Sequence, residues 1–95
     1  MLTRTYTQYI TEKTEFMHKN NKSKMKVYTS PMENDTYHKE YCFENGAQWC
    51  EVCSIVTEMA EANIHGITMT VEVELFRTEY WSTADSRSKY MYERV

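Results

Sequence analysis

Residues 67–75 alternate strictly between apolar and polar side chains. The apolar positions are Ile67, Met69, Val71, Val73 and Leu75, and threonines and glutamates separate them. A period of two over nine residues is typical of a β-strand that has one buried face and one wet face. Such a strand needs partner strands and a cover for its apolar face, so it constrains the whole fold. The neighbouring apolar pair Leu75 and Phe76 interrupts the alternation and predicts a β-bulge or the end of regular pairing there.

The residues just before this strand fit a helical period instead. One stripe of their helical projection is apolar and consists of Trp49, Val52, Cys53, Val56, Met59, Ala60, Asn63 and Ile64. Asn45 suits an N-cap, with Gln48 completing an approximate capping box. Gly66 suits a left-handed helix end. We therefore predict a helix over residues 46–64.

Four other segments favour strands. Residues 24–29 and 37–43 alternate, and turn-forming residues around Pro31 separate them, which predicts a hairpin. Residues 89–95 predict a last strand after a polar loop over residues 82–88. Residues 3–17 are rich in Thr and Tyr and indicate a strand, although their Glu and Lys content leaves a helix open from about Thr11.

These elements predict an α+β fold in the order βββαββ, within a single domain of residues 1–95. The chain is 41% hydrophobic and 26% charged, an ordinary globular balance. Leucine occurs only as Leu2 and Leu75, which argues against a helical bundle. We expect a mainly antiparallel sheet of four to five strands with one helix packed on one face. The opposite face of that sheet would have no cover.

The net charge of −3 is unevenly distributed. Residues 1–30 carry a formal charge of +4, residues 31–66 carry −6 and residues 67–95 carry −1. This gradient predicts a molecule with a basic hairpin and an acidic helix, in which Glu51, Glu58 and Glu61 form a ridge. The alternative is a solvated surface on which both signs interleave after folding.

The sequence lacks the usual catalytic motifs. Gly46 and Gly66 are the only glycines, so no glycine-rich phosphate loop occurs, and neither a nucleophile elbow nor an H-E-x-x-H motif is present. No apolar run approaches the roughly 18 residues of a membrane span, and residues 1–6 lack a stretch of signal-peptide type. An odd number of cysteines argues against a secreted disulfide framework. We expect a non-enzymatic, cytoplasmic protein without a cofactor or membrane partner.

Two minor hypotheses involve the cysteines. A small zinc-binding domain could use Cys42, Cys50 and Cys53 with His38 or His65, although the spacing matches no standard zinc motif. The Cys50-x-x-Cys53 pair would also sit near the start of the predicted helix, where redox pairs occur. The chain lacks the βαβ context of such redox proteins.

Single-stranded nucleic-acid binding is the main alternative function. Basic groups with an exposed aromatic ring on a sheet can hold phosphates and stack bases, and the candidates are Lys19, Lys22, Lys24, Lys26 and Tyr28. The acidic net charge and the absence of an RNA-binding signature make nucleic acid a less favoured partner.

Protein binding is the favoured function. Tyrosine and tryptophan are enriched in interface cores because they bring a large contact area with few rotatable bonds. We predict a small module that acts stoichiometrically as an inhibitor or adaptor on a protein with a basic surface, or that forms a homodimer. An inhibitor from a phage or mobile element is one concrete form. The predicted contact residues are Glu51, Glu58, Glu61, Tyr80, Trp81, Tyr90 and Tyr92.

Overall fold

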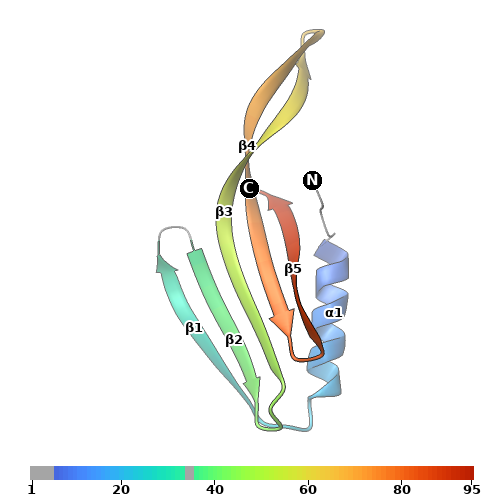
Figure 1. The fold of residues 1–95 in the computed structure, drawn as a ribbon, viewed down its shortest axis with the longest axis vertical. Helices are drawn as coiled ribbons and strands as arrows, with labels where there is room; N and C mark the ends of the chain where they lie inside the picture. Colours follow the sequence, from blue (N-terminus) through green and yellow to red (C-terminus); the bar gives the residue numbers. More distant parts are fainter. Residues whose placement is uncertain (1–5, 34–35) are drawn as a thin grey trace.

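The computed structural model describes residues 6–33 and 36–95, which form one helix followed by five strands (Figure 1). The elements are α1 (Tyr6–Lys19), β1 (Met25–Glu33), β2 (Thr36–Phe43), β3 (Gln48–Ile64), β4 (Ile67–Ser82) and β5 (Asp85–Arg94). The strands form one sheet in the order β1-β2-β3-β4-β5, and all neighbours are antiparallel. The predicted α+β class with an antiparallel sheet is confirmed. The predicted order βββαββ is wrong, because the helix comes first.

The helix α1 occupies most of the segment for which we predicted a strand; residues 3–5 of that prediction lie outside the described residues. Tyr9 and Phe16 are seven residues apart, so they lie on the same side of the helix, and both are buried. Between them, Lys13 also reaches the sheet. This helical spacing of buried residues outweighs the Thr- and Tyr-rich composition. The alternative prediction, a helix from about Thr11, covers only part of α1.

The helix predicted over residues 46–64 is wrong, because nearly all of this segment is the long strand β3. Its β-branched residues favour extended backbone. The following turn has positive φ at both central residues, 53° at His65 and 79° at Gly66, as a two-residue type I′ hairpin requires. Gly66 is therefore left-handed as predicted, but it joins two strands. Asn45 caps no helix; its side-chain oxygen accepts a hydrogen bond from the Ala47 amide at 2.9 Å.

The other predicted strands are confirmed with altered ends. The alternating segment forms part of β4, which continues to Ser82, and the β1–β2 hairpin pairs as expected. No bulge occurs at Leu75 and Phe76, which pair regularly with β3; the irregularity lies between Tyr80 and Ser82. The last strand starts at Asp85, so the preceding loop is shorter than predicted.

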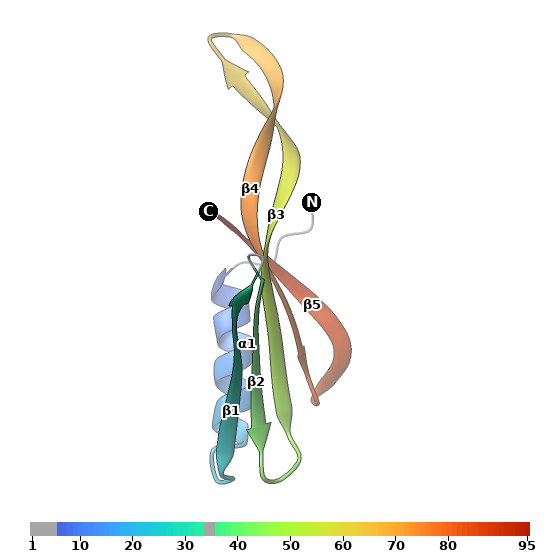
Figure 2. The same ribbon diagram turned by 90° about the vertical axis from the view of Figure 1, so that its left-hand side faces the viewer.

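The core lies between α1 and the centre of the sheet. Figure 2 views the sheet nearly edge-on and shows α1 on one side of it. The buried cluster contains Tyr9, Phe16, Phe43, Trp49, Tyr80 and Met91. The Trp49 and Tyr80 rings stack with centroids 5.2 Å apart, and Phe16 lies 5.4 Å from Trp49. Because such ring pairs add about 0.5–1.5 kcal/mol beyond their buried area, this aromatic cluster fixes α1 on the sheet.

Beyond the core, β3 and β4 continue as a two-stranded ribbon (Figure 1). β2 pairs with β3 only as far as Ser54, and β5 pairs with β4 only from Leu75 onward. We call residues 57–74 the arm, and α1 with the rest of the sheet the body. The radius of gyration is 16.6 Å, whereas a compact chain of this length has about 12 Å. The molecule is thus elongated, with extents of 56 × 27 × 18 Å.

Candidate protein-binding surface

The pairing register divides the body side chains between two faces of the sheet. The face under α1 includes Trp49 and Tyr80. We call the opposite face, on which no described element packs, the open face. It carries Lys26, Tyr28, Cys42, Cys50, Val52, Trp81, Tyr90 and Tyr92. Three of the predicted contact residues, Trp81, Tyr90 and Tyr92, therefore share one uncovered surface.

Two other predicted contact residues are buried under α1. Tyr80 is 2% exposed and Glu51 is 9% exposed, so neither reaches the surface. Lys13 Nζ lies 2.7 Å from Glu51 Oε1 and donates to the Tyr41 hydroxyl at 3.0 Å. Burial raises the pKa of the Glu51 carboxyl to about 7. Glu51 therefore holds α1 against β3, and its side chain is buried beneath the helix.

The predicted acidic ridge on a helix is wrong, because its residues belong to β3. Glu58 and Glu61 are three positions apart, so along a strand they point to opposite sides. Both lie in the arm, where Glu72 and Glu74 of β4 join them. Residues 57–74 contain no lysine or arginine, which gives the arm a formal charge of −4.

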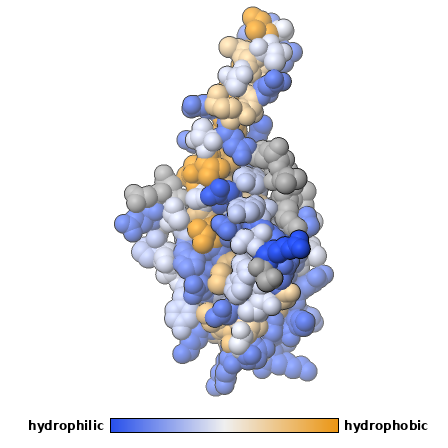
Figure 3. Space-filling model, in the orientation of Figure 1, coloured by the Kyte–Doolittle hydropathy of each residue, from blue (hydrophilic) through white to orange (hydrophobic). Residues whose placement is uncertain are grey.

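The arm is also amphipathic. One side continues the open face along the twist of the ribbon and is formed by Glu58, Ala60, Ala62, Ile64, Ile67, Met69, Val71 and Val73. Ile64, Ile67 and Met69 are 42%, 63% and 46% exposed. Figure 3 shows hydrophobic residues that reach the tip of the arm. An isolated two-stranded ribbon is marginally stable at best, and no described element covers the apolar side of the arm.

The basic residues gather at the other end of the molecule. Residues 19–26 contain four lysines and no acid, and we call them the basic segment. Lys19, Lys22 and Lys24 line one shallow hollow, while Lys26 and the 54% exposed Tyr28 lie on the open face. Figure 1 places this segment at the end of the long axis opposite the arm. The charge separation expected from the sequence is therefore present, but the arm carries the acidic end.

The cysteines are not arranged as a site. Cys42 and Cys50 lie on the open face, whereas Cys53 lies on the face under α1, so the C-x-x-C pair points in opposite directions. All three thiols are free, and the described residues contain no group of three or more potential ligands placed to hold a metal. Burial and the charges of Glu40 and Cys42 raise the pKa of the Cys50 thiol, which lowers its reactivity.

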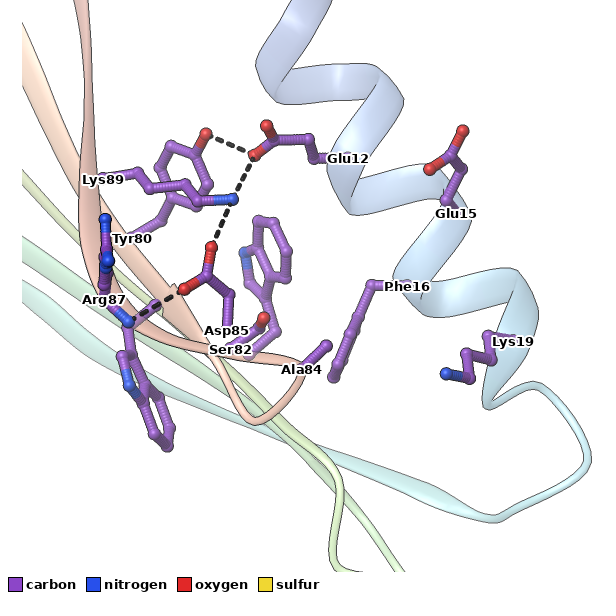
Figure 4. Close-up of a pocket in the computed structure, with 12 residues that line it drawn as sticks. Glu12, Glu15, Phe16, Lys19, Tyr80, Ser82, Ala84, Asp85, Arg87 and Lys89 are labelled. Carbon is purple, nitrogen blue, oxygen red and sulfur yellow. Dashed lines mark hydrogen bonds and ion pairs between the residues drawn. The ribbon is translucent and has the colours of Figure 1, made fainter.

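A pocket of about 220 Å³ lies between α1 and the β4–β5 turn (Figure 4). Glu12 accepts a hydrogen bond from the Tyr80 hydroxyl at 2.6 Å and lies 3.5 Å from Lys89 Nζ. Lys89 also lies 2.8 Å from Asp85, and this bond is the main cause that lowers the Asp85 pKa. These contacts hold α1 against β5. Sequence reasoning missed Glu12, Lys13 and Lys89, since the contacts that join α1 to the sheet through them span 28 to 77 positions along the chain.

No protein-family model, curated protein or solved structure matches the chain. Within the residues that the structure describes, no helix has the length and apolarity needed to cross a bilayer.

Proposed function

We propose that the protein is a non-enzymatic binding module that associates stoichiometrically with a protein partner through the arm and the open face. The observation that carries this proposal is the apolar side of the arm, where exposed Ile64, Ile67 and Met69 lie side by side on two paired strands. Water-exposed apolar patches with polar rims are typical of protein–protein contact sites.

The charges of the arm define the chemistry of the partner. Both strands of the arm carry glutamates, and the arm contains no lysine or arginine to neutralise them. A complementary partner presents an apolar surface bordered by lysine or arginine, and the opposite charges accelerate association. Trp81 and Tyr90 supply aromatic anchors on the open face of the body. Bound in this way, the protein acts as an inhibitor or adaptor, and the free thiols suit the reducing cytoplasm.

Single-stranded nucleic-acid binding remains the second candidate, because Lys19, Lys22 and Lys24 line one hollow. The arm argues against nucleic-acid binding, because it carries four glutamates and no lysine or arginine, and these carboxylates repel phosphates. The two functions use opposite ends of the molecule, so variants of each end separate them.

The test is quantitative capture from a host lysate by immobilised protein. We expect Ile67→Ser/Met69→Ser to reduce capture of the partner at least about tenfold, because each buried side chain contributes about 1.5–3 kcal/mol. The matched control Thr68→Ser/Thr70→Ser changes the polar side of the same ribbon and should retain the partner. Equal capture by the wild type and by Ile67→Ser/Met69→Ser would contradict the proposal. Capture that is lost with Lys22→Ala/Lys24→Ala and after nuclease treatment would contradict it as well and favour nucleic-acid binding.

A further inference from the structure

Two surfaces have no cover among the described residues: the apolar side of the arm and the open face of the body. They match each other in length. Residues 57–64 give the arm eight residues per strand, about 26 Å at about 3.3 Å per residue. The body strand β2 also has eight residues and thus the same length. The arm therefore takes up about half of the 56 Å long axis, and the body the other half. The arm of one molecule can span the open face of another.

The two ends of the long axis match in charge, with Glu58 of the arm on its apolar side and Glu61, Glu72 and Glu74 on its other side. The arm carries four glutamates without a lysine or arginine, and the basic segment carries four lysines without an acid. They lie at opposite ends of the long axis (Figure 1). Two copies aligned antiparallel place each arm beside the basic segment of the other copy, so both ends attract. A parallel pair would place like charges together.

The apolar groups fit the same arrangement. The apolar side of the arm continues the open face on the same side of the β3–β4 ribbon. A twofold axis where the arm meets the body, near Val56, lets both arms contact both bodies at once. Val71 of each arm then lies level with Val52 and Tyr90, which are 37% and 40% exposed on the open face, and Met69 lies level with Trp81. Such an isologous contact uses one patch twice and closes without further copies.

We propose that the arm and the open face bind a second copy of this chain, forming an antiparallel twofold dimer. This inference rests on the proposed function, because it names the partner of the same surface. A heterologous partner with a basic rim would compete with the second copy for the arm.

The first measurement is the solution mass of the full chain by light scattering at about 50 µM protein and low salt. We expect about twice the chain mass of 11.4 kDa. Raising the salt about tenfold should shift the dimer toward monomer, because it screens exposed charges beyond a few ångströms. A wild-type monomer at this concentration overturns the proposal.

A charge exchange tests the antiparallel arrangement. The arm variant carries Glu58→Lys, Glu61→Lys, Glu72→Lys and Glu74→Lys, and the basic-segment variant carries Lys22→Glu, Lys24→Glu and Lys26→Glu. Each variant alone sets like charges against each other at both ends, so we expect monomers. An equimolar mixture restores attraction at both ends and should give a heterodimer.

The matched control, Glu15→Lys/Glu93→Lys, reverses two exposed glutamates outside both surfaces and should remain a dimer. A wild-type dimer that survives both reversals, or a mixture that stays monomeric, overturns the antiparallel arrangement. The capture experiment of the proposed function and the mass measurement give independent results. A monomer that still captures a protein through its arm refutes the dimer and leaves the binding module, whereas a dimer whose arm captures nothing limits the module to self-association.

Discussion

The strands β3 and β4 run through two different environments. In the body they pair with β2 and β5 as well as with each other, and α1 covers them; in the arm they pair only with each other. Trp49 in the body is 2% exposed, whereas Ile67 at the end of the arm is 63% exposed. Alternation of apolar and polar residues therefore specifies strands in both regions, but the large apolar side chains toward the tip of the arm stay exposed. Among the described residues, no further element covers the apolar side of the arm.

Removing a large core side chain should show this contrast most strongly. We expect Trp49→Ala to reduce the free energy of unfolding by about 3–5 kcal/mol, since it leaves a cavity among the rings of Tyr9, Phe16 and Tyr80. Ile67→Ala should change it by no more than about 0.5 kcal/mol in the monomer. Urea unfolding at high salt and low protein concentration measures both. Equal losses would mean that the arm is as well packed as the body.

Glu51 gives the stability of the body a dependence on pH. Its pKa of about 7 in the folded protein lies above the unfolded value of about 4.5, so the folded protein binds the extra proton between these pH values. Stability is therefore greatest below about pH 4.5 with respect to this group and falls as the pH rises through about 7. The expected loss is on the order of 3 kcal/mol at most.

The variant Glu51→Gln serves as the control for this dependence. It keeps an acceptor for Lys13 but cannot ionise, so its unfolding free energy should be flatter than that of the wild type between pH 5 and pH 8. Glu61→Gln, on the exposed arm, should leave the wild-type profile unchanged. Parallel profiles for wild type and Glu51→Gln would show that Lys13 already offsets the cost of burying the charge.

The elements that sequence reasoning identified correctly are those with local signals. The alternation of β4 and the alternation of the paired strands β1 and β2 are contained within short stretches. The helix assigned to residues 46–64 fails because its apolar residues fit both periods, and pairing with β4 decides between them. That pairing could have been inferred from His65 and Gly66, which form a two-residue turn next to an alternating strand.

The contact surface was only partly predictable for a similar reason. Tyr80 and Trp81 are adjacent in a strand, so they cannot share a face, and alternation alone indicates that one of them is buried. Which of the two is buried depends on where α1 packs. The contact between Glu51 and Lys13 spans 38 positions, and no local pattern reports it. The structure places Trp81, Tyr90 and Tyr92 together on the open face. The arm was missed because its β3 strand was assigned to the helix.

A smaller effect should come from the hydrogen bond that joins α1 to β4. Tyr80→Phe removes the 2.6 Å bond to Glu12 and leaves the ring in place. We expect a loss of about 1–2 kcal/mol in the free energy of unfolding, because the acceptor is a charged group at a partly buried site. Tyr28→Phe, on the open face, is the matched control and should be neutral. A neutral Tyr80→Phe would indicate that solvent replaces the bond.

The smallest global effect is expected at Gly66, where the arm turns. Its φ of 79° is unfavourable for other residues, yet an added Cβ would meet no atom within 4 Å. Gly66→Ala therefore strains only the turn, by about 1 kcal/mol. Because the arm is held by two strands alone, this strain should open it locally and accelerate amide hydrogen exchange about fivefold in residues 62–69. Amides around Trp49 should exchange at the wild-type rate. If they accelerate equally, the arm and the body unfold as one cooperative unit, and the contrast between them applies only to solvent exposure.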